Sequence, residues 1–292
     1  MSDDLIPSAE AESPPVILQL SGISKHFPGV KALSDVDFDL HQGEVHVLFG
    51  ENGAGKSTLI NIIAGSFAPD AGTITVRGEP LRLSSPHHAR ELGINAVFQE
   101  FSLVPTLSVQ DNLYLGREIK RGGLLDKSAM ERGAKATLDR LGFHVDSRAQ
   151  VGRLSRAEQQ MVEIAKAIQS SPSVLILDEP TASLTETEAE QLFTVVESLK
   201  ASGIGIIYIT HRMQEIHRIA DRITVLRDGR HVTTVAAGGI SEQRLVELMT
   251  GRTIEALYPT VQGNPQRTMV EVSGLTLPSG RVHDVSITVR SG

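Results

Sequence analysis

Short apolar runs alternate with amphipathic stretches along the chain from Val16 onward. Val45–Phe49 is a short apolar run of strand length. Val174–Leu177 and Ile204–Ile209 are continuous apolar runs, as expected for strands that are covered on both faces. Segments with helical periodicity lie between them. This alternation predicts an α/β fold with a largely parallel sheet.

Capping boxes predict where two of the helices begin. Ser128 and Glu131 have the spacing of a capping box, and so do Thr185 and Glu188. The residues expected on the inward stripes, with the glycine that ends each helix, are Met130, Ala134, Leu138, Leu141 and Gly142 in the first helix, and Ala189, Leu192, Phe193, Val196, Leu199 and Gly203 in the second.

Composition and charge narrow the function classes. The chain has 28 basic and 35 acidic residues, a net charge of −7, which disfavours a protein that grips a nucleic-acid backbone. It has no cysteine, which excludes disulfides, thiolate nucleophiles and cysteine-based metal centres. Residues 1–15 read as an acidic, disordered tail without the basic start and apolar stretch of a signal peptide. The apolar runs are too short to span a membrane, so we expect a cytoplasmic protein.

A glycine-rich motif follows the first apolar run. Gly50–Thr58 reads GENGAGKST and matches G-x-x-x-x-G-K-[ST] between a strand and a helix. Gly53 and Gly55 let the backbone curl so that its N–H groups point at phosphate oxygens, and the helix that follows, ended by Gly65, adds its dipole. A glycine-rich turn without a ligand is the alternative. The predicted phosphate-binding residues are Gly50, Glu51, Asn52, Gly53, Ala54, Gly55, Lys56, Ser57 and Thr58.

Three residues of this motif carry side chains suited to a nucleotide and its metal. We expect Lys56 to reach the β- and γ-phosphates and the Ser57 hydroxyl to ligate Mg²⁺. Thr58 lies where its hydroxyl or N–H group meets the α-phosphate.

Two acidic residues follow the second apolar run, in the sequence VLILDEP. Asp178 is expected at the carboxyl edge of the sheet, where it holds the hydration shell of Mg²⁺, and Glu179 is expected to act as the base or to orient water. A solvated strand end is the alternative. The upstream phosphate loop favours the catalytic interpretation.

The segment LSRAEQQMVEIAKAI, which begins at Leu154, completes a familiar set of motifs. Together with GENGAGKST and VLILDEP it resembles the nucleotide-binding domain of ABC transporters, and most closely the tandem ATPases of bacterial monosaccharide importers. The resemblance covers about residues 16–258. It implies a P-loop NTPase fold with a mainly parallel core sheet, an antiparallel β subdomain and a helical subdomain at about residues 100–165. It also implies ATP and Mg²⁺ as cofactors.

The same resemblance assigns roles to further residues. In that family the segment that begins at Leu154 and Ser155 is the signature that caps ATP bound on the opposite domain. Here Arg156, Ala157 and Glu158 replace the usual Gly, Gly and Gln. We expect Ser155 and Glu158 to contact nucleotide, although Ser155-x-x-Glu158 is also an ordinary capping box.

Three single residues match family positions by their order and their place after strands. The resemblance implies that Gln99 in VFQE links Mg²⁺ sensing to the membrane partner and that His211 in YITHRM contacts the γ-phosphate. It also implies that Phe27 in KHFPGVKAL stacks on adenine. The expected catalytic residues are therefore Glu179, His211 and Gln99, and the expected Mg²⁺ ligands are Ser57, Gln99 and Asp178.

The beginning of the chain recurs near its end. LSGI at Leu20–Ile23 returns as VSGL at Val272–Leu275, an offset of 272 − 20 = 252 residues. DVDFDLHQG at Asp35–Gly43 returns as DVSITVRSG at Asp284–Gly292, an offset of 284 − 35 = 249 residues. A chance match of short strands is the alternative to a duplication. The shared order and spacing predict that 269–292 is the truncated start of a second ABC domain, joined by a linker at 259–268.

Among the functions open to such a chain, an importer ATPase for a monosaccharide agrees with all of the motifs. A soluble ABC-type ATPase that acts on ribosomes or nucleic acid is the alternative, but only about 55 residues separate Gln99 from Leu154, and the net charge is −7. A small-molecule kinase or GTPase leaves LSRAEQQ and DEP unexplained, and an exporter domain is commonly fused to membrane spans.

The importer hypothesis carries its own partners. We expect membrane permease subunits, indirectly a periplasmic sugar-binding protein, and a second ABC domain in tandem or in a homodimer, but no nucleic acid. The expected location is cytoplasmic and peripheral, on the inner face of the cell membrane.

Overall fold

The computed structural model describes residues 14–252 and 267–290, which fall into two compact units, Met1–Gly251 and Arg252–Gly292. Most of the predicted tail (1–13) and of the predicted linker (259–266) lies outside the described residues. Among the helices that are described, none is long and apolar enough to cross a bilayer.

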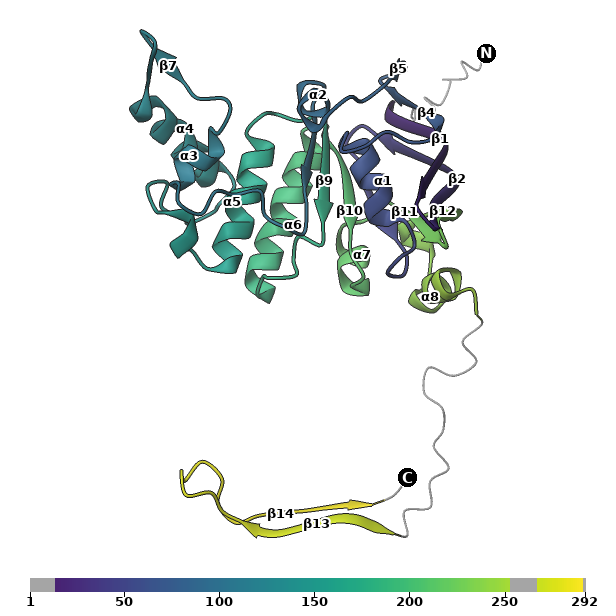
Figure 1. The fold of residues 1–292 in the computed structure, drawn as a ribbon, viewed down its shortest axis with the longest axis vertical. Coiled ribbons are helices and arrows are strands. Elements are labelled where there is room, and N and C mark those ends of the chain that lie inside the picture. Colours follow the sequence, from purple (N-terminus) through teal and green to yellow (C-terminus); the bar gives the residue numbers. More distant parts are fainter. Residues whose placement is uncertain (1–13, 253–266, 291–292) are drawn as a thin grey trace, which may run out of the picture. The chain divides into compact units, whose positions relative to one another are not determined.

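The core of the first unit is a six-stranded sheet with the strand order β12-β11-β3-β10-β9-β6 (Figure 1). Five neighbouring strands are parallel, and β12 pairs with β11 in the antiparallel sense. The predicted α/β fold with a mainly parallel sheet is thus confirmed. The strands are β3 (Val45–Phe49), β6 (Ile94–Val97), β9 (Val174–Asp178), β10 (Gly205–Ile209), β11 (Arg222–Arg227) and β12 (Arg230–Ala236).

Alternate residues of each core strand face two different apolar clusters. In β10, Ile206 and Tyr208 join the cluster that contains the buried side chains of α5, α6 and α7, whereas Ile207 and Ile209 join the cluster that contains α1. Because side chains alternate along a strand, both faces of the sheet are covered. The four helices are α1 (Lys56–Ile63), α5 (Arg156–Ile168), α6 (Glu186–Ala201) and α7 (Met213–Ile219).

A four-stranded antiparallel sheet with the order β2-β1-β4-β5 forms a second layer on the α1 side. Its buried side chains share the α1 cluster, so α1 is packed between two sheets. The elements are β1 (Val16–Phe27), β2 (Val30–His41), β4 (Ala71–Val76) and β5 (Glu79–Leu81), followed by α2 (Pro86–Glu91).

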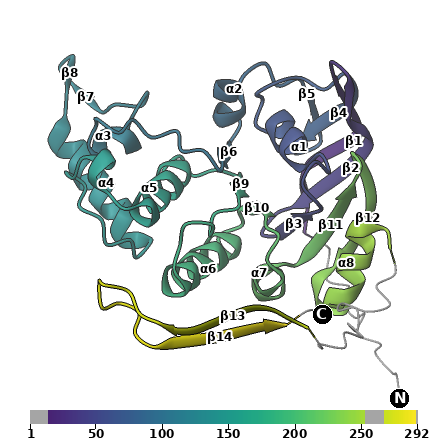
Figure 2. The ribbon, with the colours of Figure 1, turned by 60° about the horizontal axis from the view of Figure 1, so that its bottom comes forward.

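A helical lobe lies at the opposite end of the first unit from this antiparallel sheet (Figures 1 and 2). It holds α3 (Val109–Leu113), α4 (Lys127–Arg140) and the start of α5, with a small hairpin of β7 (Lys120–Arg121) and β8 (Leu124–Leu125) and a 3₁₀ turn, η1 (Val151–Arg153). The unit ends with a second 3₁₀ turn, η2 (Ala237–Gly239), and α8 (Glu242–Thr250).

Of the two capping boxes predicted from the sequence, one is confirmed and the other is wrong. Thr185 and Glu188 form a capping box at the start of α6. The box predicted at Ser128 and Glu131 is wrong, because α4 begins two residues earlier than that box requires. The Asp126 carboxylate caps it by accepting the Ala129 N–H at 2.9 Å. Asp126 directly follows β8 and precedes Ser128, so the helix can begin right after the strand with Asp126 as its N-cap residue.

The second unit is a hairpin of β13 (Thr268–Leu275) and β14 (Val285–Arg290), and it repeats β1 and β2 residue by residue. Leu20 pairs with Phe38, and the corresponding Val272 pairs with Ile287. Side-chain bonds repeat as well, since Asp35 N–H donates to Ser24 Oγ and Asp284 N–H to Thr276 Oγ1, both at 3.0 Å. The two sequence repeats therefore share one backbone geometry.

Candidate active site

A pocket of about 650 Å³ opens at the carboxyl ends of the parallel strands of the first unit. Ligands commonly bind at this edge of an open α/β sheet. The lining residues that the sequence predicted are Phe27, Asn52, Gly53, Gly55, Lys56, Ser57, Thr58, Gln99, Asp178 and Glu179.

The phosphate loop owes its shape to its glycines. Gly53 and Gly55 have φ of +84° and +100°, and Gly55 is the residue before the first turn of α1. A Cβ on Gly55 would lie 2.8 Å from the Ala32 carbonyl oxygen, a contact that leaves no room for a side chain. The loop therefore follows a path that glycine alone permits, and it leads into the amino end of a helix.

The side chain of Lys56 folds back onto the loop and bonds backbone carbonyl groups of the loop. Its Nζ donates to the carbonyl oxygens of Gly50 at 2.7 Å and Glu51 at 2.9 Å. Burial lowers the pKa of Lys56, and the carboxylates of Glu179 and Asp178 oppose that change. The ammonium group is thus held at the mouth of the loop, facing two acids.

Asp178, the last residue of β9, has no cation at bonding distance among the described residues. Burial and, to a smaller extent, the adjacent Glu179 raise the pKa of Asp178 to about 6, against the opposing charge of Lys56. An oxygen donor set of Asp178 and the Ser57 hydroxyl beside a phosphate loop fits Mg²⁺, which takes one or two carboxylates and completes its shell with water and phosphate. Within residues 14–252 and 267–290 no group of three or more His, Asp or Glu side chains gathers as a closed metal site.

Glu179 and His211 form a pair at the edge of the pocket. His211 Nδ1 lies 2.9 Å from Glu179 Oε1. Glu179 has φ of +48°, in the left-handed region that a non-glycine residue rarely adopts, and its N–H donates to the Ile209 carbonyl at 3.0 Å. Backbone strain of this kind is often retained at functional sites.

Some predicted residues lie away from the pocket lining. Ser155 and Glu158 form a capping box at the start of α5, with N···O distances of 2.7 and 3.2 Å. Gly50 and Ala54 are buried under the loop, and Glu51 is exposed. Ser155 and Glu158 are therefore not brought to the phosphate loop within this one domain.

Two groups of residues near the site were missed by the sequence analysis. Lys31, Asp228 and Gly229 line the same pocket, although they belong to distant parts of the chain. Phe67, which was not predicted, packs edge to face against the predicted Phe27, with ring centroids 5.5 Å apart. Their positions follow from strand pairing, and no local motif marks them.

Gln99 and Glu179 also line a second pocket, of about 470 Å³, that runs toward the helical lobe. Arg156 and Gln159, from the first turn of α5, line it too. Gln99 and Glu179 thus lie between the pocket at the phosphate loop and the pocket at the helical lobe.

A glycine-rich loop that joins a parallel strand to a buried helix and faces two acids at the end of the next strand but one defines a P-loop nucleotide-binding domain. The family model described as "ABC transporter" matches residues 33–182, about half of the chain. The chain belongs to the ABC transporter family.

Curated relatives narrow the comparison. "Ribose import ATP-binding protein RbsA 1" of Rubrobacter xylanophilus is 50% identical over 276 residues, which are 94% of this chain and 55% of that protein. "Putative ribose/galactose/methyl galactoside import ATP-binding protein 1" of Agrobacterium fabrum is 49% identical over 278 residues, 95% of this chain and 55% of that protein. The chain therefore spans about half the length of the curated relatives it matches.

Solved structures agree on the fold. MJ1267, described as an ATP-binding cassette of an ABC transporter in its ADP conformation, has a TM-score of 0.68 and 27% identity, and the match covers 80% of this chain and 95% of that one. A nucleotide-free cassette from an ABC transporter has a TM-score of 0.69 and 26% identity, over 82% of this chain and 98% of that one.

Proposed function

We propose that this chain binds and hydrolyses MgATP as part of an ABC importer for a monosaccharide. One observation carries the ATPase proposal: the phosphate loop and its Lys56 face Asp178 and Glu179 in a single pocket, with His211 bonded to Glu179. Support for a sugar comes from the curated relatives, whose names specify ribose or galactose import.

The residues of the pocket divide the work. Loop amides and Lys56 bind the phosphates, and Phe27, a residue that is 41% exposed, offers a face of its ring to the base. Ser57, Asp178 and Gln99 would hold Mg²⁺, which supplies positive charge to the phosphoryl group when it is bound. Glu179 accepts a hydrogen bond from the attacking water and orients it, and His211 keeps the Glu179 carboxylate in place.

We also propose that the second unit begins a second domain of the same kind, after a domain at about 16–258 and a linker at 259–268. Leu18, Leu20 and Leu40 are at most 1% exposed in the first unit, where the antiparallel sheet covers α1. The corresponding Val270 and Val289 are 52% and 49% exposed. An apolar face of this kind needs the rest of a domain to cover it.

Such a pair of domains explains the position of the signature. Ser155 and Glu158 of one domain would cap the nucleotide on the phosphate loop of the other, in a tandem pair or a homodimer. The permease subunits, the sugar-binding protein and a location at the inner face of the membrane belong to the same proposal.

The test is the rate of ATP hydrolysis per chain across a wide dilution series, with light scattering to follow the mass. We expect slow turnover whose specific rate rises with protein concentration, since hydrolysis needs two chains. A fast, concentration-independent rate from a confirmed monomer would contradict the composite site. In vesicles that hold the assembled transporter, ribose or galactose with its binding protein is expected to raise hydrolysis, and an amino acid is not.

A further inference from the structure

A buried carboxylate that the catalytic proposal does not use lies next to Glu179 and His211. Glu215, in the first turn of α7, is 5% exposed. It accepts three hydrogen bonds from hydroxyl groups: from Thr181 Oγ1 at 2.5 Å, from Tyr208 OH at 3.1 Å and from Thr210 Oγ1 at 2.7 Å. All three donors are buried as well.

These donors belong to the segments that carry the catalytic pair. Thr181 follows Glu179 by two residues, and Thr210 directly precedes His211. The network continues past the histidine, because the Arg212 N–H donates to Thr210 Oγ1 at 3.0 Å. One carboxylate therefore holds the loop after β9 and the loop after β10 together.

The chemistry of the position explains why a carboxylate is useful there. A buried carboxylate is costly unless its oxygens accept several hydrogen bonds, and here both oxygens do so. Burial, and then the Glu215 carboxylate, raises the pKa of Tyr208, so its hydroxyl remains a donor. An apolar residue at this position would accept none of these hydrogen bonds and would hold neither loop.

The backbone of Glu179 needs such support. Its φ of +48° is unfavourable for a residue with a side chain and persists only where its surroundings hold it. The Ile209 carbonyl holds Glu179 itself, through its N–H, and Glu215 holds the residue two positions later. The 2.9 Å contact between Glu179 and His211 depends on both loops at once.

We propose that Glu215 is a positioning residue for ATP hydrolysis, which fixes Thr181 and Thr210 so that Glu179 and His211 stay in hydrogen-bonding contact. This inference rests on the proposed ATPase function. Sequence analysis missed Glu215, although the spacing His-x-x-x-Glu, with the glutamate in a first helical turn, was available as a signal.

The first test compares Glu215→Gln with the wild-type chain at a protein concentration where hydrolysis is measurable. The amide keeps the shape but replaces one acceptor oxygen with a donor. We expect kcat to fall at least tenfold and the KM for MgATP to change less than twofold, because the phosphate loop binds through its own amides. Thr181→Val is expected to act in the same direction, and Thr181→Ser, which keeps the hydroxyl, to retain most of the activity.

Glu44→Gln is the matched control. Glu44 is also 5% exposed and also accepts several polar contacts, but it precedes β3 at the opposite edge of the same sheet. A purely structural role predicts equal losses of kcat in both variants, and that result would overturn the proposal. An unchanged kcat in both Glu215→Gln and Thr181→Val would overturn it as well.

A double-mutant cycle and hydrogen exchange complete the test. If Glu215 acts through His211, Glu215→Gln lowers kcat less than twofold in a His211→Ala background. Losses of kcat that multiply in the double variant would contradict the proposal. In Glu215→Gln we expect faster amide exchange at Arg212 and over residues 179–184, without nucleotide. A wild-type chain that does not hydrolyse ATP refutes the proposed function, and exchange alone then decides whether Glu215 holds the two loops.

Discussion

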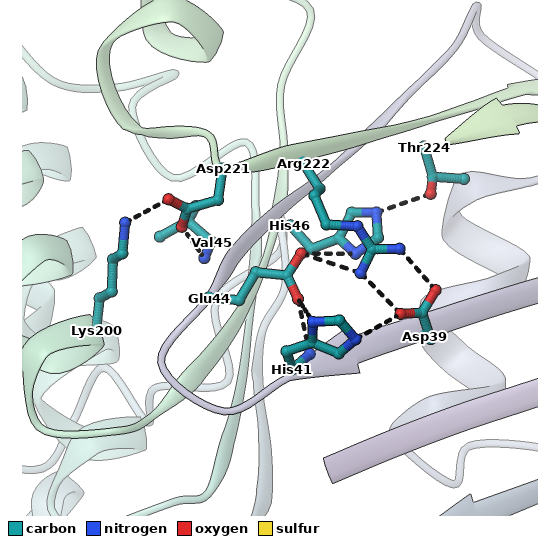
Figure 3. Close-up of polar contacts among 9 residues, drawn as sticks. All are labelled: Asp39, His41, Glu44, Val45, His46, Lys200, Asp221, Arg222 and Thr224. Atoms are coloured by element: carbon teal, nitrogen blue, oxygen red, sulfur yellow. Dashed lines mark hydrogen bonds and ion pairs between the residues drawn. The ribbon is translucent and has the colours of Figure 1, made fainter. Parts of the chain in front are cut away.

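The two ends of the same parallel strands carry charged residues in opposite arrangements. At the amino ends of β3 and β11, acids and bases are interleaved in a closed network (Figure 3). At the carboxyl ends of β3 and β9, the adjacent acids Asp178 and Glu179 face Lys56 across an open pocket that Lys31 also lines. The same sheet thus carries a structural cluster at one edge and a reactive cluster at the other.

The partners of each charge account for the difference. Arg222 Nη1 and Nη2 bond the Asp39 carboxylate at 2.7 and 2.9 Å, and this bond lowers the pKa of Asp39. Glu44 Oε1 lies 3.3 Å from the same guanidinium, which opposes the rise that burial causes in the pKa of Glu44. At the other edge burial and the adjacent Glu179 raise the pKa of Asp178 to about 6, and no cation among the described residues is bonded to it. Acids left without a bonded cation mark a place for one, whereas paired acids hold the fold.

The largest effect is expected at the reactive edge. Glu179→Gln removes the carboxylate that we propose orients the attacking water, so turnover is expected to fall about 10²–10⁴-fold while MgATP stays bound. Steady-state hydrolysis and equilibrium binding measure the two quantities. Glu79→Gln, an exposed position on β5, is the control and is expected to change neither. Unchanged hydrolysis in Glu179→Gln would show that this domain is not a catalytic site.

At the paired edge the expected effect is on acid stability. Burial lowers the pKa of His46 to about 3. Below pH 6.5 the unfolded chain therefore binds a proton that the folded chain refuses, and the free energy of unfolding falls as pH drops toward 3. The slope from this group reaches about 1.4 kcal/mol per pH unit. His46→Gln is expected to flatten the slope between pH 6 and 4 in urea titrations, and an unaltered slope would contradict this role.

Breaking the network from the basic side gives a direct stability loss. Arg222→Met leaves Asp39 and Glu44 without their shared cation, and we expect the free energy of unfolding to fall by about 2 kcal/mol. MgATP affinity is expected to remain unchanged, because Arg222 is at the other edge of the sheet. Arg230→Met, at an exposed arginine of the neighbouring strand, is the matched control. A loss of affinity without a loss of stability would reverse the comparison.

Lys56→Ala removes the cation of the phosphate loop that faces Asp178 and Glu179. We expect the affinity for MgATP to weaken at least tenfold, about 1.4 kcal/mol, with little loss of stability. Calorimetry measures the binding, and Lys135→Ala, an exposed lysine on α4, controls for the loss of a charge. Undiminished binding would refute the assignment of the loop.

The smallest effect is expected from Asp178, whose contribution to the free energy of unfolding changes with pH in the opposite direction to that of His46. The folded carboxyl of Asp178 takes up its proton near pH 6 and the unfolded one near 3.8, so this group costs stability as pH rises from 3.8 to 6. Asp178→Asn is expected to stabilise the nucleotide-free chain by about 1 kcal/mol at pH 7, after allowance for its partial exposure, and to have no effect at pH 3.5. Equal changes at both pH values would mean that the gain is unrelated to ionisation.

Local patterns predicted the parts of the molecule that depend on neighbours in sequence. The phosphate loop lies where GENGAGKST predicted it, and the capping box at Thr185 forms, because its two residues lie one helical turn apart. The box at Ser128 failed because a second capping residue, Asp126, lay closer to the preceding strand. Where two nearby residues can both cap a helix, the local sequence does not decide which of them does so, and the surrounding chain sets the start of the helix.

Contacts between distant segments were beyond such patterns. Asp39 and Arg222 are 183 residues apart, and nothing in either local sequence predicts their pairing. Lys31 and Asp228 reach the pocket because β11 lies beside β3 and the antiparallel sheet covers α1. Glu215 shows the same limit, since its three donors come from two strand ends that only the parallel pairing of β9 and β10 brings together.

The sequence by itself determined the alternation of strands and helices, the phosphate loop, the acids after β9 and the repeat of the first hairpin. Each of these depends on residue types at fixed short spacings, which backbone sterics and periodicity translate directly into structure. Only the tertiary structure decided which charges are paired. Whether a carboxylate meets a guanidinium, a hydroxyl or another carboxylate depends on strand order and burial, because these decide which distant side chains share one low-dielectric space.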